Sequence, residues 1–180
     1  MDVATESRSA TTASVFLAGL QAGMIAVCWM LAWMGVSARW QGRDFWTSEN
    51  LMASLLYGDA AIRLGFAFST IAGLALYLIL YSLLGALWAT AVRSRLTGLG
   101  TLLVGILFAL GWYYLWFHAI GKTVMPLVAL LHSERPTVFG HVIYGGLLAR
   151  FHSYLPRPEQ PAASETPIDS EAGPSIDREG

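Results

Sequence analysis

Residues 64–92, LGFAFSTIAGLALYLILYSLLGALWATAV, decide the fold, because these 29 residues include no charged side chain. A helix at the surface of a water-soluble protein shows a polar face on every turn, and this stretch shows none. A transmembrane helix needs about 20 predominantly apolar residues. The stretch is therefore predicted to cross a membrane.

The composition of the whole chain indicates the same surroundings. Of its 180 residues, 55% are hydrophobic and only 13% are charged, and the mean hydropathy is +0.52. Soluble domains carry roughly a quarter charged residues, so the charged side chains here could not cover a surface in water. We expect the body of the chain to be embedded in a lipid bilayer.

Three further apolar runs extend this prediction to a polytopic, all-α protein. We expect a four-helix transmembrane bundle with spans at about 14–36, 64–92, 101–120 and 137–155. The fourth span is short, since Thr137 to Ala149 holds 13 uncharged residues, and Arg150 would have to extend its side chain to the membrane surface. Two segments that are too short to span, about 47–58 and 123–132, are predicted to lie at the interface.

The two ends of the chain have a different composition from its body. Residues 1–13 are polar and rich in Ser and Thr, and residues 156–180 are acidic and rich in Pro, so both are predicted to be disordered. The body from Ser14 to Leu155 carries eight basic and four acidic residues, a net charge of +4. A basic body is suited to loops that lie against anionic lipid headgroups.

The orientation depends on the loop basic residues, which are almost evenly divided between the two sides of the predicted bundle. Arg93 and Arg95 lie in the shortest loop, where the excess of basic residues on the cytoplasmic side is most reliable. We therefore expect a multi-pass protein of the cell (inner) membrane with both termini in the cytoplasm.

Small residues spaced four apart occur in every predicted span. Helices in lipid associate by close packing, and small residues let their backbones approach. The residues predicted to make these contacts are Gly19, Gly23, Ser69, Gly73, Gly105 and Gly145.

Few polar side chains of the predicted spans could bind a ligand. The candidates are Gln21 in the first span, His118 near the end of the third, and His141 and Tyr144 on one face of the fourth. A bundle pocket near these four residues could bind a lipid, a quinone or a small solute. His118 and His141, on different helices, could ligate a haem, but their predicted depths differ. A structural contact between His141 and Tyr144 is the favoured interpretation.

The sequence contains no pattern typical of an enzyme. It lacks a nucleophile elbow, an H-E-x-x-H zinc motif, a phosphate-binding loop and a carboxylate pair within the membrane. A basic, aromatic-rich patch for nucleic acid is also missing. We expect no catalytic activity, no metal and no cofactor, and a structural or accessory role in the inner membrane. The partners would be the lipid bilayer and another protein or a second copy of this chain.

Two short stretches resemble a family of bacterial inner-membrane proteins. They are residues 140–146, GHVIYGG, and residues 46–58, WTSENLMASLLYG. That family has about four spans, an aromatic-Asn loop after the first and an H-x-x-Y-G element in the last. The resemblance implies the four-span fold and brings no activity with it. The family often has a histidine where Tyr77 stands here, which argues against a role for paired histidines.

Overall fold

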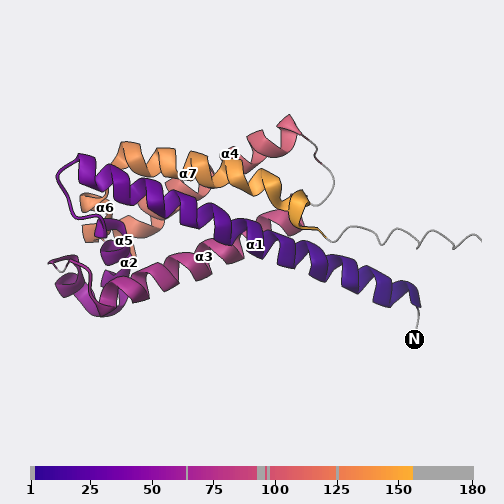
Figure 1. Ribbon diagram of the computed structural model, residues 1–180, viewed down its shortest axis with the longest axis horizontal. Helices are drawn as coiled ribbons and strands as arrows, with labels where there is room; N and C mark the ends of the chain where they lie inside the picture. The colour runs from indigo at the N-terminus through magenta and orange to yellow at the C-terminus, as the bar shows by residue number, and fades with distance from the viewer. Residues whose placement is uncertain (1–2, 64, 93–95, 97, 125, 156–180) are drawn as a thin grey trace, which may run out of the picture.

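The computed structural model describes residues 3–63, 65–92, 96, 98–124 and 126–155. Within these residues every regular element is helical, as the sequence predicts (Figure 1). Three helical stretches in this described part of the chain are long and apolar enough to cross a membrane, namely Thr12–Trp40, Phe68–Val92 and Leu99–Val124. At 1.5 Å per residue each is longer than about 35 Å, which exceeds the hydrocarbon thickness of roughly 30 Å.

The helices follow one another with short connections. In chain order they are α1 (Val3–Trp40), α2 (Thr47–Tyr57), a 3₁₀ segment (Gly58–Arg63), α3 (Phe68–Val92), α4 (Leu99–Tyr114), a π-helical turn (Leu115–Ile120), α5 (Gly121–Val124), α6 (Pro126–Leu131), α7 (Glu134–Leu148) and a second 3₁₀ segment (Ala149–Tyr154). Helices α2 and α6 coincide closely with the two segments predicted to lie at the interface.

The first helix begins earlier than predicted. Helix α1 starts at Val3 rather than at residue 14, so most of the expected disordered leader is helical. Residues 3–13 contain neither Gly nor Pro, and adding a residue to an existing helix is far easier than starting a new one. Residues 1–2 and the predicted disordered tail at 156–180 lie outside the described residues.

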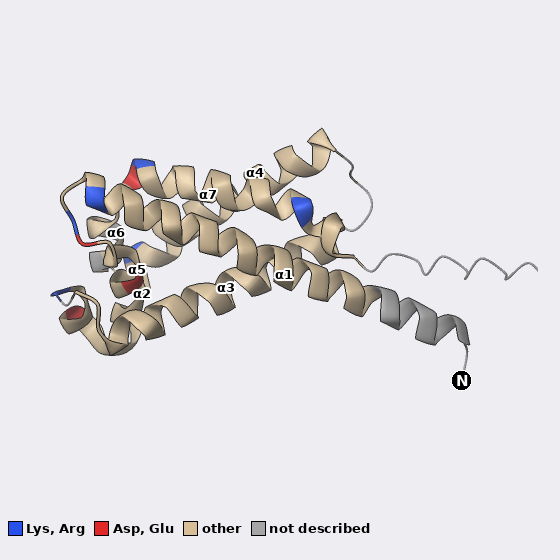
Figure 2. Cartoon of the chain, in the orientation of Figure 1, with Lys and Arg blue, Asp and Glu red and all other residues tan. Residues whose placement is uncertain are grey.

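Four helices run alongside one another in alternating directions. Helix α1 packs between α3 and α7, and α4 packs against α7 (Figure 1). The short helices α2, α5 and α6 gather at one end of the bundle, which we call the α2 end. Charged side chains collect at the α2 end and are sparse along the middle of the long helices (Figure 2). This distribution matches a bundle whose middle lies in hydrocarbon.

Small residues line the contact between α1 and α3. A Cβ atom placed on Gly19 would lie 2.6 Å from the Cβ of Ala89 and 2.7 Å from the Cα of Ala86. A Cβ atom on Gly23 would lie 2.7 Å from the backbone oxygen of Tyr81. These distances are too short for any side chain, so the two backbones are in direct contact.

The same kind of contact joins α4 to α7 and α2 to α3. A Cβ atom on Gly105 would lie 2.5 Å from the backbone oxygen of Gly145, and the converse distance is also 2.5 Å. A Cβ atom on Gly73 would collide with the backbone oxygen of Glu49. Ser69, one turn earlier on α3, is buried. At Gly19, Gly23, Gly73, Gly105 and Gly145 a side chain would collide with the neighbouring helix.

Large aromatic side chains occupy the core where the backbones are further apart. Tyr81 and Trp88 of α3, Tyr113 of α4 and Tyr144 of α7 are all almost fully buried. The ring of Trp88 packs edge-on against Phe151, with the ring centroids 5.2 Å apart. The Trp88 ring thus connects α3 to the 3₁₀ segment that follows α7.

Candidate functional site

The first polar cluster joins α7 to α3 in the middle of the bundle. The Tyr81 hydroxyl lies 2.8 Å from Nε2 of His141, and the Tyr144 hydroxyl donates a 2.6 Å hydrogen bond to the backbone oxygen of Tyr81. His141 and Tyr144 are one helical turn apart, so both reach the same residue of the neighbouring helix. We call Tyr81, His141 and Tyr144 the tyrosine–histidine clamp.

The hydrogen bonds of the clamp determine the tautomer of His141. Nδ1 lies 2.8 Å from the backbone oxygen of Thr137, which can only accept, so Nδ1 carries the proton and donates. Nε2 of the neutral ring then accepts from the Tyr81 hydroxyl. Both ring nitrogens are therefore used within the bundle, and a haem iron could bind His141 only by displacing one of these partners.

The four residues predicted to share a pocket do not surround one cavity. Gln21 and His118 are exposed on the outside of the bundle, whereas His141 and Tyr144 are buried. The His118 ring stacks on Tyr114, with the ring centroids 5.3 Å apart. Among the described residues, no group of three His, Cys, Asp or Glu side chains is arranged to hold a metal ion.

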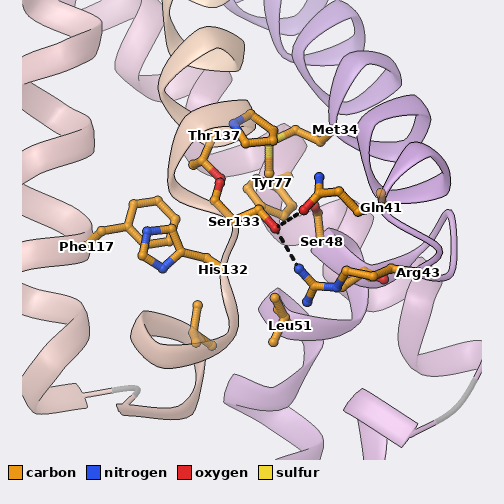
Figure 3. Close-up of a pocket in the computed structure, with 14 residues that line it drawn as sticks. Met34, Gln41, Arg43, Ser48, Leu51, Tyr77, Phe117, His132, Ser133 and Thr137 are labelled. Carbon is orange, nitrogen blue, oxygen red and sulfur yellow. Dashed lines mark hydrogen bonds between the residues drawn. The ribbon is translucent and has the colours of Figure 1, made fainter.

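A pocket lies instead at the α2 end, between the end of α1, α2 and the start of α7 (Figure 3). Its free volume is about 30 Å³, roughly the space of two water molecules. Its polar lining includes Gln41, Arg43, Thr47, Ser48, His132, Ser133 and Thr137, and its apolar lining includes Met34, Leu51, Phe117, Val128 and Pro136. We call it the interface pocket.

A hydrogen-bonded chain of side chains forms one wall of the interface pocket. Nη1 of Arg43 donates to the Ser133 hydroxyl at 2.8 Å, and that hydroxyl donates to Oε1 of Gln41 at 2.6 Å (Figure 3). Nη2 of Arg43 donates to the backbone oxygen of Leu131 at 2.9 Å. The loop after α1 is thereby attached to the loop before α7.

Aromatic rings form the opposite wall. His132 stacks on Phe117, with the ring centroids 4.3 Å apart, and its Nε2 lies 3.4 Å from the Tyr113 hydroxyl. Phe117 belongs to the π-helical turn that follows α4. Single π turns inside α-helices often occur at functional sites, and this one places Phe117 against the pocket.

A second polar network joins α2 to α3 beside the pocket. The Thr70 hydroxyl donates to Oδ1 of Asn50 at 2.7 Å, and Nδ2 of Asn50 donates to the backbone oxygen of Gly65 at 3.1 Å. Thr70 and Asn50 are both buried. The network fixes the start of α3 against the middle of α2.

Glu49, the neighbour of Asn50, is the one acidic side chain of the described residues that is buried, with 2% of its surface exposed. Its Oε2 atom has no hydrogen-bond partner among the described residues. Burial raises the pKa of Glu49 from 4.5 to about 7, and the nearby charge of Asp44 adds to this, while a hydrogen bond from its own backbone N–H opposes it. Glu49 can therefore take up or release a proton near neutral pH.

Glu49, Arg43 and the pocket were not predicted from the sequence. Glu49 stood in a short segment predicted to lie at the interface, and in the structure its backbone oxygen lies against Gly73 of α3. The available signal was the mixture of aromatic and charged residues at 39–46, next to the segment that contains Glu49 and Asn50. His132 and Ser133 gave no comparable signal, because they fall between two apolar runs.

No protein-family model, curated protein or solved structure matches this chain, so its function must be inferred from the arrangement of its own residues.

Proposed function

We propose that this chain is a non-catalytic structural or accessory protein of the bacterial inner membrane, with four spans. The observation that carries this proposal is the tyrosine–histidine clamp. His141, 1% exposed, and Tyr144, fully buried, make hydrogen bonds from α7 to α3. Such bonds are typical of polar residues that hold membrane helices together.

The length of α7 supports a fourth span. Helix α7 has 15 residues and the 3₁₀ segment after it has six, which together give about 34 Å of helix at the usual rises. Charged residues flank this length, with Glu134 and Arg135 at one end and Arg150 near the other. Helix α7 also packs between two spanning helices, α1 and α4. A shared environment with these neighbours favours a span.

An even number of spans would put both termini on one side of the membrane. Arg93 and Arg95 in the shortest loop favour the cytoplasm as that side.

The orientation is tested by cysteine labelling in intact cells. In a Cys28→Ser background, a cysteine at Gly42 should react with a membrane-impermeant maleimide, and one at Gly98 should react only after lysis. The reverse result would invert the topology, and equal reactivity at both positions would contradict the intervening span.

The outer surface of the α2 end offers contacts for a protein partner. Trp40 is 75% exposed at the end of α1, and Leu56 is 63% exposed on α2. Trp prefers the headgroup zone, and Leu56 adds exposed apolar surface at the same end of the bundle.

The function is tested by affinity purification in a mild non-ionic detergent, with mass spectrometry of the bound proteins and lipids. An accessory role predicts a stoichiometric protein partner, or a homo-oligomer, that is weakened by Leu56→Gln. The matched control is Leu107→Gln, which changes an equally exposed leucine in the middle of α4. A monomer that retains only a small molecule, or a haem chromophore, would contradict the accessory role and favour a ligand-binding protein.

A further inference from the structure

The interface pocket contains a positive charge that no acidic side chain of the described residues balances. Arg43 is half-buried and donates hydrogen bonds only to neutral oxygens, those of Ser133 and Leu131. Within the described part of the chain, no carboxylate lies within 4 Å of its guanidinium. The nearest acid in sequence, Asp44, accepts a 2.8 Å hydrogen bond from the backbone N–H of Trp46 instead.

The other residues around Arg43 do not supply a negative charge. The pocket is lined by no Asp or Glu among the described residues, and Arg43 is the only Lys or Arg there. A guanidinium has five N–H groups in a planar fork, and two of them serve the hydrogen bonds to Ser133 and Leu131. Three remain for other acceptors. A planar or tetrahedral oxyanion is the group that such a fork binds best.

The apolar surroundings of Arg43 indicate what carries the oxyanion. Met34 and Leu51 lie on the pocket wall. Leu131, whose backbone oxygen binds Arg43, has an exposed side chain, and its neighbour Leu130 is 78% exposed. An acyl chain lying along these leucines would keep its charged head beside Arg43. The free volume of about 30 Å³, roughly the space of two water molecules, suits a small oxyanion head.

We propose that the interface pocket binds the oxyanion head of an acyl amphiphile, a carboxylate or a phosphate, through Arg43. This inference goes beyond an accessory role, because it gives the α2 end a ligand of its own. Its test needs only the purified full-length chain in detergent and no protein partner. Ligand binding can therefore fail while the accessory role holds, and the accessory role can fail while ligand binding holds.

The experiment measures thermal unfolding of the purified protein in a non-ionic detergent against increasing concentrations of four probes. Decanoate and decyl phosphate carry the head and the chain, decanol carries the chain alone, and inorganic phosphate carries the head alone. We expect a saturable rise in Tm with decanoate or decyl phosphate and no saturable rise with decanol. A response to inorganic phosphate as strong as that to decyl phosphate would assign the site to a free anion rather than to a lipid.

Variants identify the pocket as the site. Arg43→Gln should weaken the response to the anionic probe by about tenfold, the loss expected for charge-assisted hydrogen bonds. Arg39→Gln, which removes an exposed arginine outside the pocket lining, should leave the response unchanged. Arg43→Lys keeps the charge and gives an intermediate response, and it replaces Arg43→Gln if that variant does not fold. Equal responses to decanol and decanoate, or a wild-type response in the Arg43 variants, would overturn the proposal.

Discussion

The middle of the bundle and its α2 end are held together by different contacts. In the middle, Gly19 and Gly145 bring backbones into direct contact, and one polar cluster, the clamp, links α7 to α3. At the α2 end, side chains such as Arg43, Ser133 and Asn50 connect loops and short helices by hydrogen bonds. Helices in hydrocarbon are stabilised by close packing, and hydrocarbon does not compete for their hydrogen bonds. Water at the membrane surface competes for each hydrogen bond between side chains. The middle should therefore depend on shape and the α2 end on polar groups and pH.

The sharpest test of the role of shape is Gly145→Leu. The added side chain has no room, because backbone atoms of Gly105 and Ile106 lie 2.5 and 2.7 Å from the Cβ position. We expect a loss of more than about 3 kcal/mol in the free energy of unfolding in detergent, the upper range for overpacking. The control is Gly111→Leu, since a Cβ atom there would have nothing within 4 Å. Equal stability of the two variants would show that the α4–α7 contact is not as close as described.

The second largest expected effect is the pH dependence of the free energy of unfolding, which comes from Glu49 at the α2 end. The pKa of Glu49 is raised to about 7 in the folded chain from an ordinary 4.5, so the folded state holds this proton more tightly. The contribution to stability is therefore complete below about pH 4.5 and falls as the pH rises toward 7, by about 3 kcal/mol in total.

Glu49→Gln removes this titration. Unfolding in detergent, measured between pH 4.5 and 8, should show a flatter profile for Glu49→Gln than for the wild type. The matched control, Glu134→Gln, changes an exposed acid at the same end of the bundle and should keep the wild-type profile. A Glu49→Gln profile as steep as that of the wild type would mean that water reaches this carboxyl group.

Loss of one hydrogen bond of the tyrosine–histidine clamp should lower the free energy of unfolding by less than Gly145→Leu or the titration of Glu49. Tyr81→Phe removes the hydroxyl that donates to His141 and keeps the backbone oxygen that accepts from Tyr144. We expect a loss of about 1 kcal/mol in the free energy of unfolding, as for other hydrogen bonds between membrane helices. Tyr114→Phe, at an exposed position on α4, is the control. A loss several times larger would mean that polar contacts, and not shape, dominate the middle.

The smallest effect is expected at the exposed edge of the α2 end. Ser133→Ala breaks the chain from Arg43 to Gln41, but water can replace the lost partner at this half-buried position. The expected loss is about 0.5 kcal/mol, at the low end for a hydrogen bond, measured against Ser153→Ala, which alters an exposed serine. A loss above that of Tyr81→Phe would reverse the comparison of the two regions.

The long helices could be predicted from the sequence because a helix in hydrocarbon needs an uninterrupted run of apolar residues. Residues 64–92 were predicted to span, and α3 covers Phe68–Val92. Which face of a helix meets a neighbour was harder to predict, because every face of such a helix is apolar. Gln21, the most polar group of the first span, is exposed, whereas His141 faces α3. The burial of Glu49 could not be predicted, since it depends on how α2 lies across α3.

The contact between Gly73 and the backbone of α2 has a consequence for how α2 can move. With hydrogen alone at position 73, the carbonyl group of Glu49 rests directly on α3. A methyl group at position 73 would displace α2 from α3. The carboxyl group of Glu49, now 2% exposed, would then be accessible to water. The raised pKa of Glu49 thus depends in part on the absence of a side chain at position 73 of another helix.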